Sequence, residues 1–261
     1  MRKFLKPDES SSGFKLSERS KNMKAQLDVH THSIASGHAY GTVTEMAKAA
    51  AEKGLKLLGI TEHAEGIPGT CNNFYFTNLG ALPREMFGVE MMFGSEINII
   101  DYEGHLSLEK KFINNLDIRI AGMHRYCYRF GNIEENTRAV ISAISNPDID
   151  IISHPDDSRA PLDYQRVVYA AKQHHTLLEI NNSSLKAKNR SNVFENCCRI
   201  LELCKELEHP VILSSDAHFM TAIADFSLCE KVLQAVSFPD ELVINYDINR
   251  FKKFISDNRC S

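Results

Sequence analysis

Short apolar segments recur along the chain, and nearly every one ends in polar or ionisable residues. Seven of these segments have the length of β-strands, at residues 26–29, 57–60, 91–93, 118–121, 150–152, 177–180 and 211–213. Helical patterns separate most of them, at residues 43–53, 134–145, 164–174, 192–206, 226–235 and 249–256. Strands that alternate with helices form parallel sheets, so this order predicts an α/β fold.

The number of strand–helix units narrows the architecture further. Seven units suit a closed or nearly closed barrel better than a flat, doubly wound sheet. We therefore expect a distorted seven-stranded (β/α)7 barrel of the TIM-like kind. Barrel enzymes carry their active sites at the carboxyl ends of the strands, which is where the polar residues of this chain stand.

Composition excludes several classes of function. The 261 residues have a formal net charge of −4, which gives no electrostatic footprint for nonspecific nucleic-acid binding. A small phosphorylated substrate remains compatible with this charge, because bound metal ions can supply positive charge locally. No apolar run approaches the roughly 18 residues that span a bilayer, so no membrane association is expected.

The cysteines and the amino-terminal residues bear on localisation. The chain has seven cysteines, an odd number, and no C-x-x-C pair, which favours a reducing, cytoplasmic environment over a disulfide framework. Residues 1–23 are polar and lack the apolar core of a secretory signal, so they are expected to be a flexible extension. Met23 is an alternative start. Residues 24–261 are then expected to form one domain.

The first strand ends in the pair His30 and His32. Residues two apart in a strand point to the same face, so these two imidazoles can bind one ion. Similar groups follow the other strands, and the candidate ligands are His30, His32, His38, His63, Glu96, His124, His154, Asp216 and His218. This set is too large for one ion but sufficient for two or three that share a bridging carboxylate. Nitrogen and oxygen ligands without thiolate suit zinc, manganese or iron.

A histidine at a strand end can also be an ordinary hydrogen-bonded residue. That interpretation suits His105, His174, His175 and His209, and the pair His174–His175 ends a helix where positive charge is favourable. It does not suit seven histidines that all follow apolar segments. Burying so many titratable groups at one barrel mouth without a metal would be costly.

These motifs together resemble the PHP (polymerase and histidinol phosphatase) family of metal-dependent phosphoesterases. The family's Asp-x-His-x-His motif matches residues 28–32, and its Thr-Asp-His motif matches residues 61–63, with Glu62 in place of aspartate. A third motif ends in Glu96, and Ser-x-Asp-x-His matches residues 214–218. Within the family, the segments around His38, His124, His154 and Asn181 look most like the YcdX-like phosphatases.

The resemblance implies a PHP-type barrel with three divalent metal ions, usually zinc, with manganese or iron as alternatives. One ion would be bound by His30, His32, Glu96 and Asp216, a second by Glu96, His124 and His154, and a third by His38, His63 and His218. Glu96 and Asp216 are the residues expected to act most directly in catalysis. The longer Glu62 is expected to reach a partner such as an imidazole N–H, leaving His63 free to bind metal.

Three further residues are candidates for binding the substrate phosphate. Arg125 directly follows His124, and Arg159 lies in the loop after His154. Guanidinium groups bind phosphate oxygens in pairs, although both arginines can equally be solvated loop residues. Asn181 ends a strand, where it can orient substrate or simply form a turn. The aromatic residues at 67–84 can either cover the site or pack against the barrel rim.

The favoured function is a metal-dependent phosphatase that hydrolyses small phosphorylated molecules with a metal-activated hydroxide. A nuclease-like phosphodiesterase uses the same chemistry, but the acidic charge balance argues against it. A noncatalytic metal-binding domain is the third alternative, and the complete set of expected ligands argues against it. A homo-oligomer is compatible with the resemblance.

Overall fold

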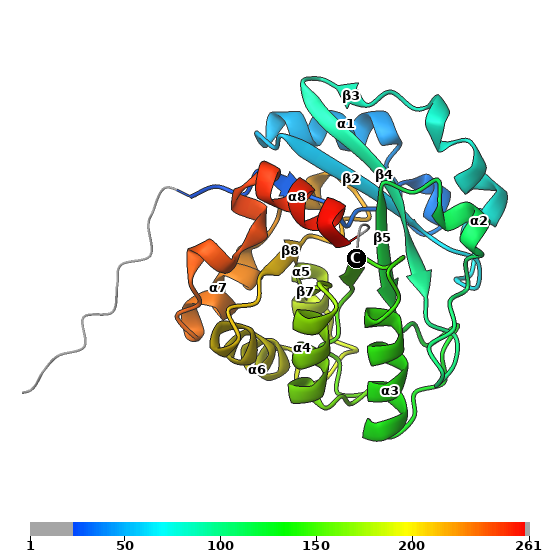
Figure 1. Ribbon diagram of the computed structural model, residues 1–261. Coiled ribbons are helices and arrows are strands. Elements are labelled where there is room, and N and C mark those ends of the chain that lie inside the picture. Colours follow the sequence, from blue (N-terminus) through cyan, green and yellow to red (C-terminus); the bar gives the residue numbers. More distant parts are fainter. Residues whose placement is uncertain (1–22, 259–261) are drawn as a thin grey trace, which may run out of the picture.

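The computed structural model of this protein describes residues 23–258, in which seven parallel strands form a nearly closed barrel (Figure 1). The barrel order is β1-β2-β4-β5-β6-β7-β8, and β3 adds an antiparallel edge to β4. The strands are β1 (Leu27–Asp28), β2 (Leu57–His63), β3 (Glu85–Met86), β4 (Val89–Asn98), β5 (Ile118–Gly122), β6 (Ile151–Ile152), β7 (Leu177–Asn181) and β8 (Val211–Ser214). The predicted α/β barrel is confirmed.

The helices surround the barrel (Figure 1). They are α1 (Val43–Glu52), α2 (Lys110–Ile113), α3 (Ile133–Ile144), α4 (Tyr164–Gln173), α5 (Asn182–Lys186), α6 (Val193–Glu206), α7 (Ser227–Ala235) and α8 (Ile248–Asn258). Side-chain capping fixes where several begin: Thr42 with Glu45, and Asn132 with Glu135, form reciprocal capping boxes at α1 and α3. The six predicted helices are present within one or two residues of their expected bounds.

Two strands extend further than their apolar segments predict. Strand β2 continues to His63 and β4 to Asn98 because their parallel ladder runs on through polar residues. This ladder pairs His63 with Glu96. The two expected ligands are thus held in register by backbone hydrogen bonds before any metal binds.

The barrel closes between its first and last strands through a few specific contacts. A parallel bridge joins Thr31 to Ala217. Below it, Asn245 spans the two strands: its Nδ2 donates to the Leu27 carbonyl at 3.2 Å and to the Leu213 carbonyl at 2.7 Å. The side-chain oxygen of Asn245 accepts from the Leu213 N–H at 2.7 Å. One buried amide therefore replaces part of the missing ladder.

Apolar side chains form two cores. The larger lies between the sheet and the outer helices. The smaller fills the amino end of the barrel, where Phe251, Phe254 and Ile255 of α8 pack against inward-facing strand residues such as Leu27 and Leu177. Helix α8 therefore lies across the amino end of the barrel (Figure 1), while the carboxyl end is left for polar groups.

Other expectations concern the terminal residues, the cysteines and the membrane. The predicted extension at residues 1–23 lies, apart from Met23, outside the described residues. The six cysteines that the structure describes are free thiols, and Cys260 lies beyond them. Among residues 23–258, no helix is both long and apolar enough to cross a membrane.

Candidate metal centre

The nine expected metal ligands converge at the carboxyl end of the barrel. His30 and His32 follow β1, and His38 follows a short 3-10 turn at Ile34–Ser36. His63 ends β2 and Glu96 lies near the end of β4. The rest stand in loops that follow β5, β6 and β8, namely His124, His154, Asp216 and His218. Ring contacts and ion pairs link all nine into one cluster.

Glu96 lies at the centre of this cluster and is 1% exposed. Its Oε1 lies 3.1 Å from His124 Nε2 and 2.9 Å from His154 Nε2. Its Oε2 lies 2.9 Å from His63 Nδ1 and 3.3 Å from His30 Nε2. The two oxygens of this carboxylate therefore face different histidines.

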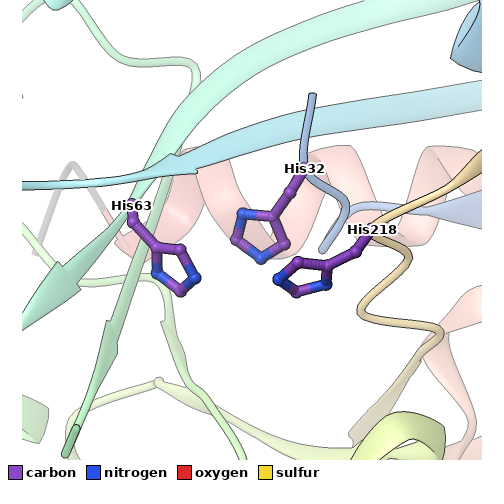
Figure 2. Close-up of side chains that lie close together, drawn as sticks. All are labelled: His32, His63 and His218. Carbon is purple, nitrogen blue, oxygen red and sulfur yellow. The ribbon is translucent and has the colours of Figure 1, made fainter. Parts of the chain in front are cut away.

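Several buried atoms of the cluster lack the partner that burial demands. In the described part of the chain, His30 Nε2, His32 Nε2, His63 Nδ1 and Asp216 Oδ1 are buried without a hydrogen bond of acceptable geometry. Figure 2 shows the side chains of His32, His63 and His218 close together, and their ligand atoms lie within 4.8 Å of one another. Inward-facing nitrogen and carboxylate atoms of this kind fit divalent metal ions.

The outward-facing ring nitrogens are held by protein acceptors. His30 Nδ1 lies 2.6 Å from Glu179 Oε1, and His124 Nδ1 lies 2.9 Å from Asn98 Oδ1. His218 Nδ1 lies 3.0 Å from the Asp216 carbonyl. Donation through Nδ1 leaves the Nε2 lone pair facing the cluster, which is the arrangement that orients a ligating imidazole.

Glu62, which replaces the usual aspartate, contacts two serine hydroxyls and not an imidazole. Its side chain accepts hydrogen bonds from the hydroxyls of Ser33 and Ser36, the latter at 2.5 Å. Ser36 Oγ in turn lies 3.1 Å from His32 Nδ1. The longer carboxylate therefore orients His32 through a hydroxyl rather than by touching an imidazole itself.

Electrostatics favour the ligand forms of Glu96, Asp216 and His32, whereas His30 differs: burial lowers its pKa, but Glu179 and Glu96 outweigh burial and raise that pKa well above its usual value. Burial alone raises the pKa of Glu96, but His124, His30 and His63 outweigh it and hold that pKa well below its usual value. The pKa of Asp216 is also held low, because His30 and His32 outweigh its burial. Burial, reinforced by His63 and His218, lowers the pKa of His32 well below its usual value. Ionised carboxylates and neutral imidazoles are the forms that bind metal.

The backbone is constrained at two of the expected ligands. His154 and Asp216 have φ angles of 30° and 52°, in the left-handed region that residues with a side chain rarely adopt. Such conformations cluster at functional sites. Gly122 serves close packing there, since a Cβ on it would lie 2.1 Å from Ser153 Oγ. Ser153 in turn donates to Glu96 Oε1 at 2.8 Å.

The cluster opens into a cavity of about 300 Å³. Seven of the expected ligands line it, while His30 and His32 are fully buried beneath. Its opposite walls combine apolar side chains, such as Met123 and Phe130, with arginines. A small molecule in this cavity can therefore contact both the cluster and these side chains.

Of the three candidates for phosphate binding, two line the cavity and one is buried. Arg125 and Arg159 both line the cavity. The Arg125 guanidinium stacks over Tyr126 at 4.8 Å, and Arg159 pairs with Asp157 through Nε at 2.8 Å. Asn181 is fully buried, caps α5, and donates to Asp216 Oδ2 at 3.3 Å. It therefore contacts an expected ligand and is not among the residues that line the cavity.

Sequence reasoning missed several residues of the site. Glu179 is the one charged residue inside the apolar segment 177–180. That position could have indicated a functional side chain that points into the barrel. Asn98 and Ser153 carried no such signal. Neither did Asn189 and Arg190, which line the cavity from the loop after α5.

The histidines expected to be ordinary lie away from the cluster. His105 pairs with Asp101 at the surface, and His209 is buried with Nε2 3.0 Å from the Thr176 carbonyl. Of the aromatic residues at 67–84, Phe76 is fully buried in the larger core, and Phe74 is 72% exposed. Phe76 thus follows the packing alternative.

Comparisons with known proteins agree with this geometry. A family model for the PHP domain matches residues 28–189. A probable phosphatase of Clostridium novyi is 43% identical over 233 residues, covering 89% of this chain and 95% of that protein. A probable phosphatase of Caldicellulosiruptor saccharolyticus is 42% identical over 233 residues, covering 89% and 97%.

Solved structures share the fold. Among them is a histidinol phosphate phosphatase from Lactococcus lactis complexed with zinc, L-histidinol and phosphate. It aligns with a TM-score of 0.55 and 16% identity, covering 82% of this chain and 95% of that one. At this identity the likeness concerns the barrel and not the substrate.

Proposed function

Because the chain belongs to the PHP domain family, we propose that it is a metal-dependent phosphatase that hydrolyses small phosphomonoesters at a three-metal site. The observation that carries the proposal is the environment of Glu96. One buried carboxylate faces histidines on both of its oxygens, at the base of a cavity that arginines line. In this proposal residues 24–261 act as a single domain.

The three ions would divide the ligands in the way the family pattern implies. His30, His32, Glu96 and Asp216 would bind the first ion, which the unpartnered His30 Nε2, His32 Nε2 and Asp216 Oδ1 support. Glu96 Oε1 with His124 and His154 would bind the second. His38, His63 and His218 would bind the third, supported by the 3.1 Å between His38 Nε2 and His218 Nε2. Zinc suits these ligands, as do manganese and iron.

Bound divalent ions supply Lewis-acid stabilisation of phosphate oxygens and a water whose pKa falls from 15.7 to about 7. The protein supplies orientation and charge. Arg125 and Arg159 face the same cavity and can hold phosphate oxygens. Asp216 lines the cavity too, so its carboxylate can take a proton from the attacking water and pass that proton to the departing alkoxide.

The size of the cavity supports a small substrate. At about 300 Å³ it stands at the lower end of the range for small-molecule sites. The formal net charge of −4 offers no attraction for a nucleic-acid backbone. The cavity and the charge therefore both favour a phosphorylated metabolite over a polynucleotide.

The proposal is tested by metal content and turnover in matched variants. We expect purified protein reconstituted after chelation to bind about three ions per chain and to hydrolyse p-nitrophenyl phosphate. Glu96→Gln should lower kcat/KM by more than about 10³-fold, because it removes several kcal/mol of metal-dependent stabilisation. Glu90→Gln is the control, since Glu90 lies on the same strand but pairs with Lys252 away from the site.

The alternatives give different results in the same assays. Turnover of bis(p-nitrophenyl) phosphate without turnover of the monoester would identify a phosphodiesterase. Fewer than one ion per chain together with no turnover would identify a noncatalytic domain. Full activity in Glu96→Gln would remove the central assignment.

A further inference from the structure

One wall of the cavity does not belong to the metal cluster. It comes from the loop that follows α5 and includes Asn189 and Arg190. Strand β7, which precedes α5, contributes no expected metal ligand. Its Glu179 and Asn181 side chains are fully buried. This wall is therefore free to recognise the part of a substrate that is not the reacting phosphate.

Arg190 is held from behind by buried polar groups. Its Nη1 donates to Ser184 Oγ at 2.9 Å and lies 3.4 Å from Asp156 Oδ1. Asp156 is fully buried and also accepts from Ser184 at 2.5 Å. The Arg190 side chain is itself 20% exposed. A guanidinium fixed at one nitrogen and open at its other edge is preorganised for a ligand.

The open edge of Arg190 matches a carboxylate. Among residues 23–258, its Nε and Nη2 have no hydrogen-bond partner, and these two atoms form the edge that binds carboxylates in pairs. Arg159 shows the same edge in use, since its Nε and Nη2 both donate to Asp157. The charge of Asp157 is thus paired with Arg159, whereas Arg190 lines the cavity with this edge unpaired.

We propose that Arg190 binds a carboxylate on the leaving group, so that the preferred substrates are small phosphomonoesters bearing a second, anionic end. Asp156 and Ser184 act as positioning residues for this guanidinium. The assignment rests on the proposed phosphatase function. It also predicts discrimination against esters whose leaving group carries an ammonium, because the wall presents a guanidinium to that position.

The test compares two esters that differ at one group. 3-Phosphoglycerate has a carboxylate where glycerol 3-phosphate has a hydroxymethyl. We expect wild-type kcat/KM to favour 3-phosphoglycerate by about 10- to 100-fold, the range for a hydrogen bond to a charged group. Arg190→Gln should bring the ratio near one by raising KM for 3-phosphoglycerate, and Arg190→Lys should restore part of it.

Positioning is tested separately from binding. Asp156→Asn and Ser184→Ala should each lower the ratio of the two esters, whereas a purely structural defect would lower both rates alike. Ser184→Ala is included because Asp156→Asn changes a fully buried group and can impair folding. Lys188→Gln is the matched control: it removes a positive charge from the same loop, but Lys188 is exposed and lies outside the cavity lining.

The outcomes separate the two proposals. A wild-type ratio near one, or a preference for histidinol phosphate over 3-phosphoglycerate, overturns the role of Arg190. Absence of turnover with every ester, p-nitrophenyl phosphate included, overturns the phosphatase function instead. In that case the ratio of Kd values for the two esters, measured by calorimetry on wild type and Arg190→Gln, still decides the assignment.

Discussion

The two ends of the barrel both bury histidines, yet they use them in opposite ways. At the amino end, His209 is 2% exposed, bonds the Thr176 carbonyl, and lies near the Phe254 ring of α8. At the carboxyl end, His30 and His32 are fully buried, and each leaves a nitrogen without a hydrogen bond of acceptable geometry. A buried histidine thus has a hydrogen-bond partner at the amino end, whereas buried histidines at the carboxyl end each keep one ring nitrogen without a partner.

The difference teaches where stability and function reside. Apolar packing by α8 fills the amino end, and burial of that kind stabilises the fold. The carboxyl end holds carboxylates and imidazoles in contact, which is unfavourable unless something binds between them. Changes at the amino end should therefore alter stability alone, and changes at the carboxyl end should alter metal binding.

The largest effect should come from truncating an apolar side chain in the smaller core, at the amino end of the barrel. Phe251 is fully buried in the smaller core, so Phe251→Ala should lower the free energy of unfolding by about 3–5 kcal/mol. Urea unfolding measures the loss, and kcat/KM per folded molecule should not change. Tyr169→Ala is the control, because Tyr169 is 55% exposed and should change stability by less than about 0.5 kcal/mol. A lower kcat/KM per folded molecule in Phe251→Ala would contradict the assignment of this end of the barrel to stability alone.

A smaller effect, of the opposite kind, is expected beneath the metal cluster. Glu179 Oε1 lies 2.6 Å from His30 Nδ1, so Glu179→Gln should weaken the orientation of that imidazole. Metal affinity should fall about 10- to 100-fold, which chelator competition measures. The exposed Glu206 at the end of α6 provides the control variant Glu206→Gln. Unchanged affinity in Glu179→Gln would mean that the orientation comes from packing alone.

The smallest effect concerns pH and the amino end. Burial lowers the pKa of His209 to about 4, below the roughly 6.5 of an unfolded histidine. The unfolded chain therefore binds more protons between these values, and the stability contributed above pH 6.5 is lost as pH falls toward 4.

The slope that His209 contributes should not exceed about 1.4 kcal/mol per pH unit. Urea unfolding of metal-free protein at several pH values should show a shallower dependence in His209→Gln than in wild type. His105→Gln should retain the wild-type slope, since the His105 side chain is 72% exposed. Equal slopes in all three proteins would contradict the assignment.

Much of the fold was readable because its signals are local. Each strand core follows from an apolar segment a few residues long, and helix starts follow from capping side chains such as Thr42 and Asn132. The short elements β3, α2 and α5 were missed because two to five residues carry too little pattern. The ends of β2 and β4 were missed because their polar residues are held by a ladder between strands.

The residues of the candidate site also fall into those that the sequence predicts and those that only the fold reveals. Its ligands could be proposed because they stand directly after apolar segments, as His63 and Asp216 do. Partners such as Ser36 for Glu62, or Asp156 for Arg190, lie 26 and 34 residues away in the chain. No local pattern links them, and only folding shows that they touch.

The sequence by itself determined that this chain is an α/β barrel with histidines and carboxylates at its strand ends, since strand period and residue order are properties of neighbouring residues. The tertiary structure alone decided which oxygen of Glu96 faces which histidine, and that Asn181 is buried while Arg190 lines the cavity. These facts depend on strand register and on loops that meet in space, because contact distances arise from packing between segments far apart in the chain.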